Sequence, residues 1–208
     1  MAVILQDDCV ECGECRKSGV CPVEAHYMPE LEWPRILRFM WSDPIAVFPK
    51  TGIAGRGTQE MKTNDISGRF RDGEVGIAVE FGRPGVGARL GDAEKASKRL
   101  AELGVAFEDE SPWTDIIDPA TGAIKDPSVK NEKVLSCIVE CKAPAEKTKE
   151  IYEALMGVAK ETETVFTLNI ISKCRKGVNP LKPVLDKASI RVRENGKTNV
   201  GLGRPLIP

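Results

Sequence analysis

Seven cysteines are the residues of this 208-residue chain whose type and spacing are best suited to chemistry, and four of them lie within the first 21 residues. The stretch Met1–Asp8 has neither the basic start nor the long apolar run of a secretory signal, so we expect a cytoplasmic protein. Disulfides are disfavoured in that compartment. We therefore predict that the clustered residues Cys9, Cys12, Cys15 and Cys21 are thiolate ligands of a metal centre.

The spacing of these four cysteines follows a known motif. Two residues separate each of the first three, Gly13 follows the second, and Pro22 follows the fourth. The stretch Asp8–Ala25 resembles the bacterial-type [4Fe–4S] ferredoxin motif, C-x2-C-x2-C-x3-C-P. The resemblance covers about 18 residues and implies electron transfer through one [4Fe–4S] cluster. The iron ligands that it implies are Cys9, Cys12, Cys15 and Cys21.

The residue types also suit such a cluster on physical grounds. Three thiolates two residues apart on a tight loop can reach three corners of a cubane, and backbone N–H groups of the loop can point at its sulfides. Gly13 permits a positive φ and a close approach of the backbone, and Pro22 stiffens the exit from the loop. We therefore expect residues 1–30 to form an iron–sulfur cluster-binding segment.

The chain departs from the motif in two respects. Five residues rather than three separate Cys15 from Cys21, and the chain contains no second copy of the motif. In two-cluster ferredoxins the cysteine before proline ligates the other cluster, so here we expect Cys21 to fold back onto the same cluster. The alternatives are an open iron site or a fourth ligand from Cys137, Cys141 or Cys174.

Zinc and disulfides are the competing interpretations of the cysteines. Structural zinc sites use paired knuckles or Cys/His pairs, which three cysteines at this spacing fit poorly. Cys137 and Cys141 lie on a predicted strand, where their Cα atoms would be roughly 13 Å apart, too far to share one metal. We expect both to be buried apolar residues, and we also favour a structural role for Cys174.

Two glycine-rich stretches could present N–H groups to an anion. Gly82–Gly91 connects a predicted strand to a predicted helix and carries Arg83 and Arg89, but it matches neither the dinucleotide fingerprint nor the P-loop. A solvated connection is the simpler interpretation of it. Lys50–Thr58 lacks Gly-Lys-Ser/Thr, and we expect it to be a packing segment. The single histidine, His26, is assigned no ligand role and argues against Ser-His-Asp catalysis.

Composition limits the class of function further. The chain has 30 Lys and Arg against 31 Asp and Glu, so it lacks the basic excess of a nucleic-acid-binding protein. A hydrophobic content of 41% with 29% charged residues is typical of a globular protein. The longest apolar stretch, near Val75–Phe81, is too short to cross a bilayer. We therefore expect binding to neither nucleic acid nor membrane.

The rest of the chain must position the cysteines. An irregular arm at 31–72 precedes a periodic region at 73–172, and a C-terminal extension at 173–208 carries a hairpin signal at Asn195-Gly196. In the periodic region, the order βαβ–connection–βαβ predicts a ferredoxin-like α+β sandwich of four antiparallel strands with two helices on one face. A parallel sheet is the alternative. The predicted strands are Val75–Phe81, Val105–Glu108, Val134–Cys141 and Thr164–Ile171.

These observations predict an iron–sulfur electron-transfer protein, or a small subunit of a larger redox enzyme, with one [4Fe–4S] cluster. The arm and the extension are long for their predicted structure, which favours docking onto a redox enzyme partner or into a homo-oligomer. The alternative is a redox-responsive regulatory module that binds an anionic small molecule at Gly82–Gly91. A stand-alone catalyst ranks third, because no acid–base or nucleophile constellation stands out.

Overall fold

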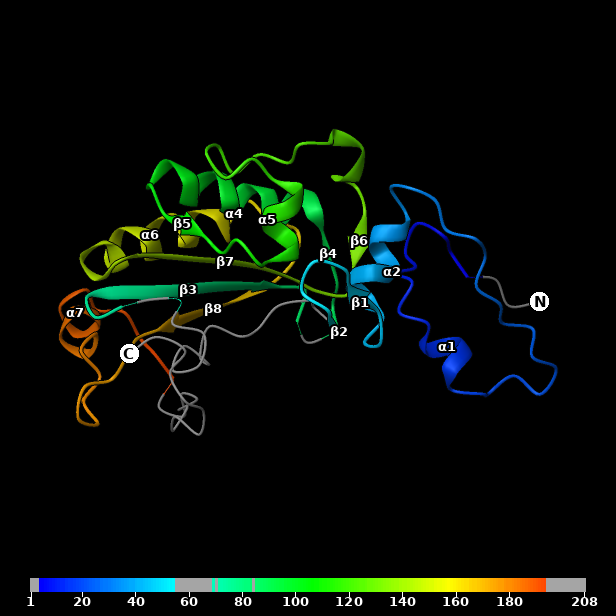
Figure 1. Ribbon diagram of the computed structural model, residues 1–208, viewed down its shortest axis with the longest axis horizontal. Coiled ribbons are helices and arrows are strands. Elements are labelled where there is room, and N and C mark those ends of the chain that lie inside the picture. Colours follow the sequence, from blue (N-terminus) through cyan, green and yellow to red (C-terminus); the bar gives the residue numbers. More distant parts are fainter. Residues whose placement is uncertain (1–3, 55–68, 70, 84, 194–208) are drawn as a thin grey trace.

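The computed structural model describes residues 4–54, 69, 71–83 and 85–193, which form a mixed α+β structure with antiparallel sheets (Figure 1). The main sheet has four strands in the order β5-β7-β3-β8, and each neighbouring pair is antiparallel, which excludes a parallel sheet. Its strands and the two long helices are β3 (Glu74–Phe81), α4 (Leu90–Glu102), β5 (Ala106–Phe107), β7 (Cys137–Pro144), α6 (Thr148–Val158) and β8 (Phe166–Ile171).

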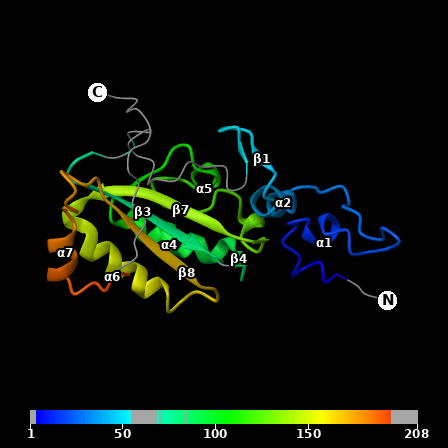
Figure 2. The ribbon, with the colours of Figure 1, turned by 90° about the horizontal axis from the view of Figure 1, so that it is seen from below.

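The hydrophobic core lies between this sheet and the helices α4 and α6, which cover one of its faces (Figures 1 and 2). Successive residues of a strand alternate between the two faces of a sheet, so the alternating apolar residues of β3 share the core face. All four of these side chains are fully buried: Val75, Ile77, Val79 and Phe81. The apolar faces predicted for the helices are buried against them. These faces include Ala93, Ala96 and Leu100 of α4 and Ile151, Leu155 and Val158 of α6.

Several predicted boundaries need correction. The strand predicted at Val134–Cys141 is two elements, because β6 (Lys133–Val134) pairs with β4 (Ala88–Arg89) before β7 begins. In the described part of the arm, the structure has α2 (Ile36–Ser42), where the sequence indicates a short helix at Pro34–Met40, and two short strands, β1 (Val47–Phe48) and β2 (Ile53–Ala54). Other short elements of the described residues are α1 (Glu14–Lys17), η3 (Ala145–Lys147) and α7 (Lys182–Lys187).

Two sequence predictions fall on residues that the structure does not describe. The hairpin at Asn195-Gly196 lies outside the described residues, as does the second half of Lys50–Thr58. Among the described residues, no helix has the length and apolar character that a membrane span requires.

The connection between β5 and β6 is ordered by contacts with α4 and α2. It contains α5 (Pro112–Ile116) and η2 (Pro127–Val129). Trp113 is fully buried, and its ring centroid lies 6.1 Å from that of Trp41 in α2. On α4, the Glu94 carboxylate accepts a hydrogen bond from the Ile124 N–H (2.9 Å) and pairs with Lys130 (3.0 Å). This connection, for which the sequence predicts neither helix nor strand, is therefore part of the folded body.

The variant Glu94→Gln tests whether Glu94 attaches the connection to α4, because the contribution of Glu94 to stability depends on pH. Burial opposes ionisation of Glu94, but the Ile124 N–H and the cations Lys130 and Lys98 outweigh it and hold the pKa of the carboxyl below its ordinary value. Ionised Glu94 therefore stabilises the fold at neutral pH, and this contribution is lost as the pH falls through its lowered pKa. We expect Glu94→Gln to lower the free energy of unfolding by about 1–3 kcal/mol at pH 7.

Urea denaturation measured from pH 7 down to pH 3 checks this expectation. The difference between the wild type and Glu94→Gln should shrink as the pH falls below the ordinary pKa of a carboxyl. Glu102→Gln on the same helix is the matched control, because the Glu102 side chain is 62% exposed and its pairing with Arg99 contributes little. A difference that grows toward acid pH would contradict the assignment.

Candidate functional site

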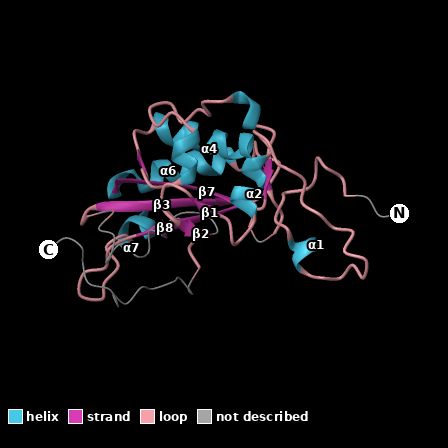
Figure 3. Ribbon diagram, turned by 45° about the vertical axis from the view of Figure 1, so that its right-hand side comes forward, coloured by secondary structure: helices cyan, strands magenta, loops and turns pink. Residues whose placement is uncertain are grey.

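Residues 4–32, here called the cysteine segment, extend from one end of the sheet beyond α2 (Figures 1 and 2). Figure 3 shows that this segment is mainly loop, with α1 as a single short helical turn. Cys9, Cys12 and Cys21 are partly buried, Cys15 is exposed, and all four thiols are free. Within the described ranges, no three His, Cys, Asp or Glu side chains are gathered to hold a metal ion. The structure thus places the four predicted ligands on one segment without bringing them together.

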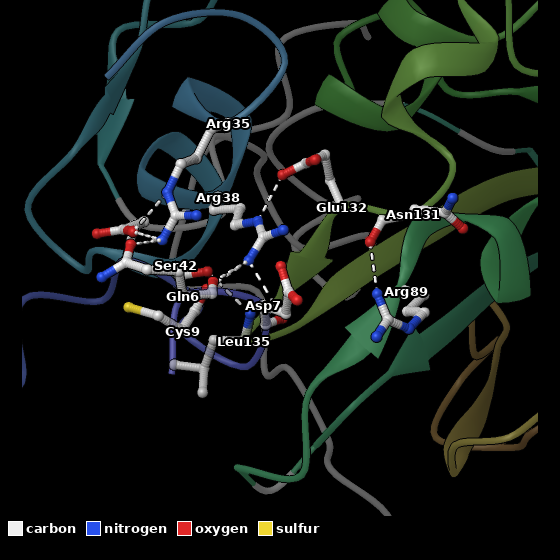
Figure 4. Close-up of polar contacts among 11 residues, drawn as sticks. Gln6, Asp7, Cys9, Arg35, Arg38, Ser42, Arg89, Asn131, Glu132 and Leu135 are labelled. Atoms are coloured by element: carbon white, nitrogen blue, oxygen red, sulfur yellow. Dashed lines mark hydrogen bonds and ion pairs between the residues drawn. The ribbon is translucent and has the colours of Figure 1, made fainter. Parts of the chain in front are cut away.

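Arg38 of α2 fixes the start of the cysteine segment to the folded body (Figure 4). Its Nη1 donates to three backbone carbonyls of the segment: Gln6 (3.0 Å), Asp7 (3.3 Å) and Cys9 (2.8 Å). Its Nε donates to the carboxylate of Glu132, just before β6, and both side chains of this ion pair are largely buried. The carbonyl of the first predicted ligand is therefore held by a guanidinium whose own position is fixed by Glu132.

A second contact holds the middle of the cysteine segment. Lys17 Nζ donates to the Cys12 carbonyl (3.1 Å) and to Asp43 Oδ1 (2.6 Å). Burial of Asp43 opposes its ionisation, but the bonds from Lys17 and from the Ile45 N–H keep the pKa of this carboxyl below its ordinary value. Gly13 packs closely here, because a Cβ at that position would lie 3.2 Å from Asp43 Oδ2.

Two further contacts lie near the ends of the segment. Arg35 forms an ion pair with Glu11 and donates to Gln6 Oε1 (2.6 Å), and Trp33 Nε1 donates to Asp126 Oδ2 (2.7 Å). In the described structure, the hydrogen bonds of residues 19–31 stay within the cysteine segment. This part of the segment is a loop that is anchored only at its two ends.

The loop places backbone donors on the sulfur of Cys21. The Ala25 N–H donates to Cys21 Sγ at 3.2 Å. This bond and a second one from the Val23 backbone lower the pKa of the Cys21 thiol, because they favour the thiolate. Thiolate sulfur that accepts backbone N–H bonds is the ligand environment of iron–sulfur clusters. The cysteine segment thus carries four free thiols, and this set of donors fits an iron–sulfur cluster.

The other three cysteines lie outside the cysteine segment. Cys137 and Cys141 are buried in β7, opposite Phe81 and Ile77 of β3, as we expected for apolar residues. Burial raises the pKa of the Cys137 thiol to about 12 and also raises that of Cys141, so both stay protonated at neutral pH. Cys174 is exposed. It follows β8, whose last residues and α7 lie at the opposite end of the sheet from α1 (Figure 1).

Four groups of Gly82–Gly91 that could bind an anion have partners within the described residues. Arg83 pairs with Glu80 (2.9 Å), and Arg89 Nη1 donates to the Asn131 carbonyl (2.7 Å; Figure 4). The first N–H groups of α4, those of Leu90 and Gly91, donate to the carbonyls of Glu132 and Lys130. Anion binding by this loop stays a prediction. The other predicted candidate, His26, is partly buried on the cysteine segment.

Sequence reasoning missed the residues that attach the segment. Arg38, Lys17, Asp43 and Glu132 carry no motif, and their partners lie far away in the chain. A charged residue on a short amphipathic helix gives no indication of such a role until its partner is known.

Comparisons with known proteins do not assign a family. The chain matches no protein-family model, and searches of the curated proteins and of the solved structures found no match. The interpretation of the site therefore depends on the cysteine spacing and on the contacts described above.

Proposed function

We propose that the chain is an iron–sulfur electron-transfer protein, or a small subunit of a larger redox enzyme, with one [4Fe–4S] cluster held by Cys9, Cys12, Cys15 and Cys21. One observation carries the proposal: Arg38 and Lys17 hold the segment by the carbonyls of Cys9 and Cys12 and leave all four thiols free. When bound, such a cluster supplies a site that gains or loses a single electron.

The two cationic residues that hold the cysteine segment, Lys17 and Arg38, suit the binding of a cluster. Four thiolates and their sulfides concentrate negative charge, and nearby cations reduce the free-energy cost of placing it next to protein. Lys17 and Arg38 lie at the backbone of the ligand-bearing loop on the side of the folded body. They position the loop, with their own charges paired to Asp43 and Glu132, while the Ala25 N–H stabilises the thiolate of Cys21.

The architecture of the folded body supports the finer fold assignment that we propose, a ferredoxin-like sandwich. The strand order β5-β7-β3-β8 and the sequence β3-α4-β5-β7-α6-β8 are those of a split βαβ pair. We also propose a cytoplasmic location, where a reducing environment keeps the thiols available. This fold hosts many functions, so the functional proposal rests on the cysteine segment.

Metal analysis of protein purified without oxygen tests the proposal. We expect about four irons and four sulfides per chain and, after reduction with dithionite, an electron paramagnetic resonance signal of spin one half. Cys21→Ala should lose most of the bound iron and sulfide, because the buried Cys137 and Cys141 and the distant Cys174 are poorly placed to replace it.

Cys174→Ala is the matched control and should retain full iron and sulfide. Zinc without sulfide in the purified protein would overturn the proposal. Full loading of Cys21→Ala would overturn the assignment of the fourth ligand, and loss in Cys174→Ala would then assign it to Cys174.

A further inference from the structure

The most exposed large apolar side chains of the described residues lie close to Cys21 in the sequence. Tyr27 is 82% exposed, Val23 78% and Val20 72%, and all three lie within eight residues of one another. Figure 1 shows the stretch between α1 and α2 as a loop that extends away from the sheet. Single exposed apolar residues are ordinary, but such a group on one extended loop marks a surface that another molecule covers.

Charge is also distributed unevenly between this segment and the rest of the chain. Residues 4–32 carry seven Asp and Glu and two Lys and Arg, a net charge of −5, whereas the other residues carry 24 acidic and 28 basic side chains. Glu24 and Glu30 flank the apolar residues and are exposed. Within the described part of the chain, neither forms an ion pair, so their charge faces solvent.

We propose that the loop around Cys21 is the docking surface for a redox protein whose own face has an apolar centre and a rim of Lys and Arg. Opposite charges steer such an encounter, and the apolar side chains supply the contact. The inference rests on the proposed function in one respect, namely that the partner exchanges electrons with this chain. A second copy fits less well, because two segments of charge −5 would repel each other.

Cytochrome c, a basic haem protein, is the probe. Two measurements are made at about 10 mM and 200 mM ionic strength, between which the screening length of charge falls from about 30 Å to less than 10 Å. The first is the dissociation constant of cytochrome c for the cluster-free chain by titration calorimetry. The second is the rate at which reduced, desalted, cluster-loaded protein gives one electron to ferric cytochrome c.

Two double variants probe the surface, and one controls for net charge. Glu24→Lys with Glu30→Lys reverses the charge of the two acidic residues that flank the apolar ones, here called the acidic rim. Val20→Ser with Tyr27→Ser removes the apolar contact. Glu110→Lys with Glu163→Lys makes the same change of net charge at exposed positions on the folded body. Ferricyanide, a small anion, is the control oxidant because it needs no docking surface.

At low salt we expect the rim reversal to weaken binding and slow the reaction with cytochrome c by about tenfold or more, and high salt to remove the difference. The serine pair should weaken binding at both salt concentrations. Neither variant should slow electron transfer to ferricyanide. The control pair Glu110→Lys with Glu163→Lys should change each dissociation constant and each rate less than twofold. Equal effects of the rim and body variants, or salt-independent rates, would overturn the docking surface.

Two outcomes separate the proposals. If protein purified without oxygen contains no iron and sulfide, and the chain still binds cytochrome c through the rim, the proposed function is overturned and the surface is retained. If the protein binds the cluster but Glu24→Lys with Glu30→Lys behaves as the wild type, only the proposed docking surface is overturned. Salt-sensitive self-association in sedimentation velocity, abolished by the rim reversal, would also overturn it, because the occupant would then be a second copy.

Discussion

Arg38→Gln is expected to lower the free energy of unfolding by about 3–5 kcal/mol, because it leaves the carboxylate of Glu132 buried without its cation. The same change removes the guanidinium that holds the carbonyls of Gln6, Asp7 and Cys9. Urea denaturation measures the first effect. Amide hydrogen exchange of residues 6–12 measures the second, which should appear as faster exchange at the start of the cysteine segment.

A paired replacement separates these two roles of Arg38. Arg38→Met with Glu132→Leu removes both charges, so most of the stability should return, because a buried ion pair can be replaced by apolar residues of similar volume. The segment should nevertheless remain loosened and its iron content reduced, since no group then binds the carbonyls. Arg99→Gln on α4 is the control, because its pair with Glu102 is exposed and contributes little to stability. Similar exchange in the wild type and the paired variant would show that Arg38 does not anchor the segment.

Gly122→Ala is expected to cost about 2–5 kcal/mol of unfolding free energy, through backbone strain and overpacking together. Gly122 has a φ of +69°, and a Cβ there would overlap the carbonyl of Ser97 and lie 2.6 Å from the Lys98 nitrogen. These are backbone atoms of α4, whose neighbouring core residues Ala96 and Leu100 are fully buried, so the helix cannot move aside. Thermal or urea unfolding measures the loss.

Gly177→Ala separates strain from contact. Gly177 has a φ of +79°, and a Cβ there would meet no atom within 4 Å, so only the cost of the left-handed backbone remains, about 1–2 kcal/mol. Equal losses in the two variants would show that the contact with α4 contributes nothing. A larger loss at Gly122 would confirm that the connection packs directly on the helix.

The parts of the fold that the sequence predicted are those set by local periodicity. The alternation Val75, Ile77, Val79, Phe81 identified a strand and its buried face, and the helical face that includes Leu100 did the same for α4. The sequence predicted no helix or strand in the connection between β5 and β6, because the burial of Trp113 depends on Trp41 and the path of the chain depends on Glu94. Such long-range contacts leave no periodic pattern.

The same contrast between local patterns and long-range contacts applies to the candidate site. The spacing of the cysteines identified the candidate ligands, because ligand geometry is a local property of one loop. The residues that hold the loop, Arg38 and Lys17, act through partners brought close only by the fold. The sequence therefore indicated what the segment contains, and the structure was needed to find what attaches it.

The burial of Cys137 and Cys141 divides the thiols of this protein into two populations of different reactivity. The remaining five cysteines are exposed or partly buried, whereas these two are shielded by the sheet and stay protonated. Oxidants or alkylating reagents can therefore modify the N-terminal thiols without reaching the core. The number of cysteines that react therefore distinguishes damage to the cysteine segment from opening of the whole fold, because Cys137 and Cys141 react only when the fold opens.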